Sequence, residues 1–304
     1  MSRYPFGSYP TGWFFALESR QLPIGAAVPL RYFGQDLVAY RTEQGRAVVL
    51  DAHCPHLGAH LGYGGVVDGE GIRCPFHAWR FDVEGRCDDV PYDGGRRPPR
   101  VGLRRHRVHE TSGLILLHHD EGDREPSWQM PDLPEWGRPG WVGYESFEWR
   151  VRMHAQELAE NIPDTAHFKT VHDAPFTPGA EIKIDGHVYR QRSLYVETGE
   201  SFTEQEAFGL GLVWVRTGER LTFLTCTTPI DEEYTWFRML FLVDGGSGAT
   251  ELSPNERVLV RSVADSAGRD VVIWGNKVYR DKPPLVPGDG PINQLRMWAR
   301  QFYE

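Results

Sequence analysis

The pattern of apolar and polar residues divides the chain into two parts. Before about residue 120, short β-prone runs alternate with glycine, proline and other turn residues at close intervals, which is typical of a small all-β domain. These runs lie at residues 37–42, 46–52, 71–76, 79–83 and 113–118. The segment 120–141 is rich in proline and charge and is predicted to be a connector.

The pattern changes from about Trp149 onward. Residues 152–168 contain helix formers, with Leu158 and Ile162 four positions apart. Long strand-like runs follow and favour an antiparallel sheet, at residues 187–197, 210–216, 220–228 and 234–244. Helical periodicity returns at 255–279, and a terminal helix is predicted at 290–303, where Pro291 suits the first turn. We therefore expect an α+β protein with an all-β domain at 1–125 and an α+β domain at 126–304.

Composition narrows the class of protein. The chain has 304 residues, 40% of them hydrophobic, and a formal net charge of −9, which argues against nucleic acid as a default partner. No apolar run approaches the roughly 20 residues that a membrane span needs. The start, MSRYPFGSYPTGW, lacks the apolar core of a signal peptide. We expect a cytoplasmic protein, in which four cysteines are unsuited to a disulfide framework.

Two loops each offer one cysteine and one histidine, and 17 residues separate His56 from Cys74. The four candidate ligands are Cys54, His56, Cys74 and His77. Zinc accepts two thiolates and two imidazoles, and so does a Rieske [2Fe–2S] cluster, in which the cysteines bind one iron and the histidines the other. The proline after each cysteine and the nearby glycines favour the iron–sulfur cluster. His53, His60, Cys87 and Cys226 fall outside this pattern and are interpreted as packing or surface residues.

A second histidine pair lies in ENIPDTAHFKTVH, residues 160–172. On an ideal helix, His167 and His172 would point about 140° apart, so they can share one metal ion only if the helix ends or is distorted between them. Asp164, three residues before His167, can share a face with it.

A site for reactive iron needs a carboxylate beside the two imidazoles, and the later helix offers Asp265 and Asp270. Asp270 falls inside an apolar stripe, where a carboxylate needs a partner such as a metal. Asp265 lies four residues from both Arg261 and Arg269, as an ion-paired surface residue would. Asp270 is therefore the predicted ligand. The expected stripe consists of Leu259, Val263, Ala267, Trp274 and Val278.

The motifs resemble those of Rieske non-heme iron oxygenases. CPHLGAHL and CPFHAWRFD, at 54–61 and 74–82, are similar to the two cluster loops of that family, with Ala78 where glycine is more usual. Residues 161–172 resemble its mononuclear-iron segment, N-x2-D-x2-H-x4-H. The C-terminal D-x3-W-x2-K pattern, with Asp270 in the ligand position, and the final QFY resemble the 3-ketosteroid 9α-hydroxylase oxygenase component and the cholesterol 7-desaturases.

The resemblance implies a Rieske domain followed by a catalytic domain of helix-grip type. It implies that His167, His172 and Asp270 bind Fe(II), and that Asp164 connects this iron to a cluster histidine of a neighbouring subunit. A head-to-tail homotrimer follows from that arrangement. The implied reaction uses O2 to hydroxylate or desaturate a substrate. Because no G-x-G-x-x-G follows a strand, we expect NAD(P)H electrons to arrive through a separate reductase, possibly with a ferredoxin.

The strands between residues 177 and 250 are expected to line the substrate pocket. Their apolar residues suit a large apolar ligand, and a steroid-like or polycyclic natural product is predicted. For any single one of these apolar residues, a place in the core is the better interpretation. They include Phe208, Leu210, Leu212, Trp214, Phe223 and Phe237. The alternatives are a smaller aromatic substrate, an electron carrier with an appended ligand-binding domain, and a zinc-stabilised binding protein.

Overall fold

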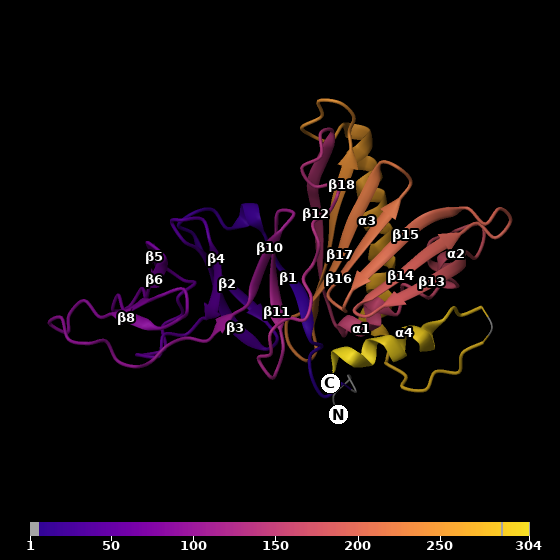
Figure 1. The fold of residues 1–304 in the computed structure, drawn as a ribbon. Helices are drawn as coiled ribbons and strands as arrows, with labels where there is room; N and C mark the ends of the chain where they lie inside the picture. The colour runs from indigo at the N-terminus through magenta and orange to yellow at the C-terminus, as the bar shows by residue number, and fades with distance from the viewer. Residues whose placement is uncertain (1–5, 287, 304) are drawn as a thin grey trace. The chain divides into compact units, whose positions relative to one another are not determined.

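The structure is a computed structural model that describes residues 6–286 and 288–303. The chain forms two compact units, which Figure 1 shows in indigo to magenta and in magenta to yellow. One unit is Phe15–His119. The other combines the described residues up to Phe14 with the described residues from Asp120 onward. Within the described ranges, no helix has both the length and the hydropathy to cross a bilayer.

The smaller unit is built from short antiparallel strands. One four-stranded sheet has the order β2 (Ala27–Tyr32), β3 (Gln35–Arg41), β4 (Ala47–Asp51), β9 (Arg105–His106). A second has the order β5 (Val66–Asp68), β6 (Gly71–Arg73), β7 (Arg80–Phe81), β8 (Cys87–Asp89). A three-stranded sheet has the order β1 (Gly12–Glu18), β11 (Leu114–His119), β10 (Val108–Thr111), and a short 3-10 helix, η1 (Ser19–Gln21), follows β1.

The core of this unit lies between the two four-stranded sheets. Tyr40, Leu50, Ile72 and Phe81 are fully buried in it. Cys54 and Cys74 belong to the same cluster of buried side chains, so the loops that carry them are anchored on a packed core. Cys87, which is also buried, packs there as well.

The larger unit contains one seven-stranded antiparallel sheet. Its order is β12 (Trp141–Val151), β18 (Thr235–Asp244), β17 (Leu221–Pro229), β16 (Leu212–Thr217), β15 (Ser201–Phe208), β14 (Val188–Leu194), β13 (Gly179–Asp185). The strands β13 to β18 follow one another both along the chain and across the sheet. The strand β12 comes before them in the sequence and pairs with the last of them, β18. The four long strand-like runs of the sequence form β14, β16, β17 and β18, as predicted, whereas β12, β13 and β15 were not predicted.

Four helices accompany this sheet: α1 (Ala155–Ala159), α2 (His167–Val171), α3 (Pro254–Asn276) and α4 (Ile292–Ala299), the last followed by η2 (Arg300–Phe302). The helix α3 begins with Pro254 in its first turn and a capping box between Ser253 and Glu256. It packs on β12 and β18, alongside which it runs in Figure 1. The predicted helical stretch 152–168 contains only α1 and the first two residues of α2, which begins at His167.

The expected apolar stripe of α3 is wrong at both ends. Leu259 is 48% exposed, and Val278 lies beyond the end of the helix and is 61% exposed. The buried residues are Val260, Ala264, Asp270 and Trp274. Adjacent helical positions point about 100° apart, so a neighbour of Leu259 faces the sheet in its place. Asp270 is buried, as predicted.

Candidate metal centres

The two cysteine–histidine loops of the smaller unit share one backbone pattern. In each, the cysteine N–H donates to the carbonyl of the residue five positions later, and the residue four positions later donates back to the cysteine carbonyl. Cys54 makes these bonds with Ala59 and Gly58, and Cys74 makes them with Trp79 and Ala78, all at 2.9 to 3.0 Å. Two loops of the same shape therefore present two equivalent pairs of side chains.

These side chains fit an iron–sulfur cluster. Cys54 and Cys74 are buried free thiols. Burial, with a smaller effect of the neighbouring Cys74 thiol, raises the pKa of Cys54 to about 11. The rings of His56 and His77 lie 4.7 Å apart, and Nδ1 of His77 is buried without a hydrogen-bond partner among the described residues. A buried imidazole nitrogen that lacks a donor is suited to bind a metal.

The loop geometry also shows why glycine is suited to one position. Gly58 and Ala78 occupy equivalent places and both have left-handed backbones, with φ of +77° and +57°. Glycine adopts this conformation without the steric penalty of a Cβ, which Ala78 bears.

The remaining histidines near this centre make other contacts. His53 is exposed, and its Nε2 lies 3.2 Å from Asp36 Oδ2. Its ring meets that of His60 at 5.1 Å. In the larger unit, Cys226 is fully buried within β17.

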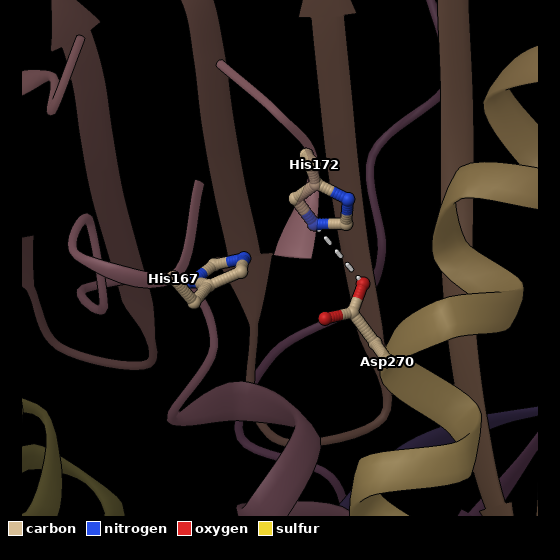
Figure 2. A group of neighbouring side chains, drawn as sticks. All are labelled: His167, His172 and Asp270. Atoms are coloured by element: carbon tan, nitrogen blue, oxygen red, sulfur yellow. Dashed lines mark ion pairs between the residues drawn. The ribbon is translucent and has the colours of Figure 1, made fainter. Parts of the chain in front are cut away.

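The second centre brings together residues that are about 100 positions apart in the sequence. Figure 2 shows the side chains of His167, His172 and Asp270 directed towards a common point. Their potential ligand atoms all lie within 4.8 Å of one another. His167 is the first residue of α2, and His172 directly follows its last residue, Val171. The helix therefore ends between the two imidazoles, as the spacing required.

Asp270 supplies the carboxylate from α3. It is 5% exposed, and its Oδ2 lies 3.2 Å from Nε2 of His172. The other ring nitrogen of His172, Nδ1, lies 2.9 Å from Ser266 Oγ. Asp265 is exposed and pairs with Arg261 at 3.7 Å, as predicted. Two imidazoles and one carboxylate form the donor set of a non-heme iron centre, so the residues present fit that metal.

Asp164 contacts His167 rather than the common point. Its Oδ1 accepts a hydrogen bond from the His167 backbone N–H at 3.2 Å and lies 3.6 Å from His167 Nδ1. Burial alone would raise the pKa of Asp164, but the hydrogen bonds and charge of His167 lower it. Burial would likewise lower the pKa of His167, and Asp164 raises it. The Asn161 amide nitrogen lies 3.3 Å from Nε2 of His167.

A cavity of about 320 Å³ opens beside this centre, between the sheet, α1, α2 and α3. Phe223 and Phe237 line it, as predicted. The lining lacks Phe208, Leu210, Leu212 and Trp214, which are buried as core residues instead. On β16 the alternation of side chains turns Val213 and Val215 to the cavity instead, because successive residues of a strand face opposite sides.

Several residues of the lining were not among the predicted site residues. Ser266 is one helical turn before Asp270, so the helical spacing alone could have indicated it. Asn161 is the first residue of the N-x2-D-x2-H-x4-H segment, so that motif contained it without a role assigned to it. The polar residues Thr203, Gln205 and Thr217 carry no local signal, because alternating polar residues on a strand usually face solvent.

Comparisons with known proteins agree with this geometry. Residues 12–100 match the Rieske [2Fe-2S] domain family, and residues 117–303 match the family described as 3-ketosteroid 9α-hydroxylase C-terminal domain. The cholesterol 7-desaturase of Bombyx mori is 34% identical over 97% of this chain and 70% of its own length. The probable 3-ketosteroid-9α-monooxygenase oxygenase component of Rhodococcus rhodochrous is 31% identical over 97% of this chain and 80% of its own.

Solved structures share the fold. Dicamba monooxygenase bound to dicamba has a TM-score of 0.76 with 18% identity, covering 97% of both chains. NdmA of Pseudomonas putida CBB5 with caffeine has a TM-score of 0.78 with 16% identity, covering 96% of this chain and 90% of its own.

Proposed function

Because the chain belongs to the Rieske oxygenases of the 3-ketosteroid 9α-hydroxylase and cholesterol 7-desaturase group, we propose that it hydroxylates or desaturates an apolar, steroid-like substrate. Members of this family carry a [2Fe–2S] cluster and a mononuclear iron, and as oxygenase components they receive electrons from a separate reductase. The enzyme is accordingly a Rieske-type oxygenase.

We assign the ligands from the two centres described above. Cys54, Cys74, His56 and His77 hold the cluster. His167, His172 and Asp270 hold the iron. When bound, these groups supply dioxygen activation and the electrons that it consumes.

One observation carries the proposal: two imidazoles and a buried carboxylate meet at the wall of an apolar cavity. An electron carrier needs no such donor set, and a zinc-stabilised binding protein needs no second centre beside its ligand cavity. Apolar side chains from the sheet and from α3, such as Val213, Phe237 and Trp274, exclude water and hold the target carbon near the metal.

The substrate class rests on the relatives and on the cavity. The relatives that are 31–34% identical are named for cholesterol and 3-ketosteroids, whereas the structural neighbours crystallised with dicamba or caffeine are 16–18% identical. A cavity of about 320 Å³ is near the lower end of ligand pockets, roughly 300–1,000 Å³, which suits a compact fused-ring substrate. A smaller aromatic substrate is the second candidate.

The assembly and the electron path complete the proposal. We expect a head-to-tail homotrimer in which Asp164 connects the iron of one subunit to a cluster histidine of the next. We expect electrons from the reductase to reach the cluster directly or through a ferredoxin. We also expect the protein to lie in the cytoplasm.

Metal content of anaerobically purified protein tests the proposal. The wild type is expected to contain three irons and two acid-labile sulfides per chain. His167→Ala and Asp270→Ala are each expected to contain two irons, with an unchanged electron paramagnetic resonance spectrum of the reduced cluster and no turnover of a steroid panel. Asp265→Ala, on the exposed side of α3, is the matched control and should keep all three irons.

Two results would contradict the assignment. Three irons in Asp270→Ala would mean that this carboxylate is not a ligand. Loss of the cluster spectrum in His167→Ala would mean that this imidazole belongs to the other centre.

A further inference from the structure

Polar side chains gather at one end of the cavity, on the inner face of β14 to β16. Thr203, Gln205 and Thr217 line the cavity there. Thr203 pairs with Thr217 on β16 and with Ser193 on β14, and Gln205 pairs with Gln191 on β14. Directly paired residues point to the same face of a sheet. Ser193 and Gln191 therefore adjoin the lining residues from the next strand.

These two residues of β14 hold unsatisfied polar atoms. Gln191 is 1% exposed and Ser193 is 0% exposed. Among the residues that the structure describes, neither Gln191 Oε1 nor Ser193 Oγ has a hydrogen-bond partner. The Gln191 amide nitrogen donates to the Ile162 carbonyl at 2.6 Å. Since only the nitrogen of an amide can donate, this bond fixes its orientation, and the atom that remains unsatisfied is an acceptor.

A buried acceptor without a partner is destabilising, so a donor is expected near Gln191 Oε1. Gln205 of β15 lies directly opposite Gln191 of β14. The Cβ atoms of directly opposite residues in an antiparallel sheet are about 5 Å apart. If the Gln205 amide nitrogen donates to Gln191, the Gln205 oxygen turns to the cavity. Gln191 itself is absent from the cavity lining, so Gln205 is the cavity residue placed to satisfy it. This arrangement presents the Gln205 oxygen to the cavity as a hydrogen-bond acceptor.

The polar end is separated from the metal centre along the strands. Across the sheet, Gln205 is level with Phe241 of β18 and Thr203 with Val243, which lie four and six residues from Phe237. Four to six residues of a strand span about 13–20 Å. Trp274 packs on Phe237 with ring centroids 5.4 Å apart, and Asp270 lies one turn, about 6 Å, before Trp274 on α3. Along the strand direction, the polar end is therefore roughly 7–14 Å from Asp270.

We propose that this polar end, formed by Thr203, Gln205 and Thr217 with Gln191 behind them, binds a hydroxyl group of the substrate away from the oxidised carbon. A hydroxyl can donate to the Gln205 oxygen and accept from the Thr203 hydroxyl. A ketone can only accept, and it leaves the amide oxygen unsatisfied. The inference rests on the proposed function, and it specifies the substrate as an alcohol within that class.

The test measures binding of three ring systems of one shape to the anaerobic holoenzyme: 5α-androstan-3β-ol, 5α-androstan-3-one and 5α-androstane. Equilibrium dialysis gives each Kd without turnover. We expect the alcohol to bind at least about tenfold more tightly than the hydrocarbon, with the ketone between them. Gln205→Leu is expected to bring the alcohol and the hydrocarbon to within about threefold, by removing the polar partner at similar volume.

Thr225→Val is the matched control. Thr225 lines the same cavity, but it is level with Ala207, four residues along β15 from Thr203. It should keep the preference for the alcohol. Iron content and the Kd of the hydrocarbon show whether Gln205→Leu is folded. If Gln205→Leu is not folded, the same three Kd values are measured for Thr203→Val and compared with those of the wild type.

The outcomes separate this inference from the proposed function. Equal binding of the three ligands, tightest binding of the ketone, or an intact preference in Gln205→Leu would overturn the hydroxyl site and leave the steroid assignment standing. Binding of none of the three would overturn the steroid assignment, and the hydroxyl site with it.

Discussion

Ser266 Oγ lies 2.9 Å from Nδ1 of His172, while Nε2 of the same ring lies 3.2 Å from Asp270 Oδ2. Ser266 and Asp270 are one turn apart on α3, so one helix face supplies a proposed iron ligand and a partner for another ligand. With Nδ1–H donating to Ser266, the lone pair of Nε2 is directed to the metal.

Ser266→Ala is therefore expected to weaken iron binding about 10- to 100-fold, because the imidazole loses the group that fixes its orientation. Iron titration of the apo centre, followed by electron paramagnetic resonance of its nitrosyl adduct, measures this affinity. Ser262→Ala removes an exposed hydroxyl one turn earlier and is the control. Equal affinities in the two variants would mean that Ser266 does not position His172.

Ala78 and Gly58 offer a reciprocal test of backbone strain in the two cluster loops. Ala78→Gly is expected to stabilise the protein by about 0.5–1 kcal/mol, because relief of the left-handed strain exceeds the added freedom of the unfolded chain. Gly58→Ala is expected to destabilise it by a similar amount. Thermal unfolding of the two holoproteins provides the measurement, and changes of the same sign in both would refute the explanation.

Asp164→Asn separates a structural role from a role in electron transfer. The asparagine oxygen can still accept the His167 N–H bond, so the fold and the iron content should persist. Loss of the charge is expected to lower steady-state turnover at least about tenfold, while chemical reduction of the cluster proceeds as in the wild type. Rapid-mixing spectroscopy of the cluster, reduced and then exposed to O2 and substrate, follows the transfer.

Asp173→Asn is the control for that variant, since Asp173 is exposed and pairs with Arg269 at 2.6 Å outside the centre. Wild-type turnover in Asp164→Asn would exclude the carboxylate from the electron path.

His154 predicts a pH dependence of stability. Burial lowers its pKa to about 3, well below the ordinary value of 6.5. Between these values the unfolded chain binds a proton that the folded chain does not. Stability is therefore unaffected above pH 6.5 and decreases as the pH falls from there towards 3. At pH 5 the loss is expected to be about 2 kcal/mol.

His154→Asn removes the titrating group and keeps an acceptor for the Gln156 N–H, which His154 Nδ1 accepts at 3.2 Å. Urea unfolding of both proteins at pH 7 and pH 5 provides the comparison. The shift of the midpoint between the two pH values should be smaller in the variant. An equal shift would assign the acid sensitivity to other groups.

The sequence by itself determined the local chemistry of both centres. The spacing of Cys54, His56, Cys74 and His77 indicated a cluster because their loops are short and bring their own ligands together. Asp270 was distinguishable from Asp265 because a carboxylate in an apolar helical stripe requires a partner, whereas one between arginines does not.

Only the tertiary structure decided which distant residues meet and which strand face lines the cavity. His172 and Asp270 approach each other because α2 ends at Val171 and α3 packs on β12 and β18. The spacing of the two histidines required the helix to end if they share a metal, but no local pattern encodes the packing of α3. On β16, Leu212, Val213, Trp214 and Val215 are all buried. When both faces of a strand are covered, the alternation of apolar and polar residues that reveals the inner face is lost, and the surrounding elements alone assign it.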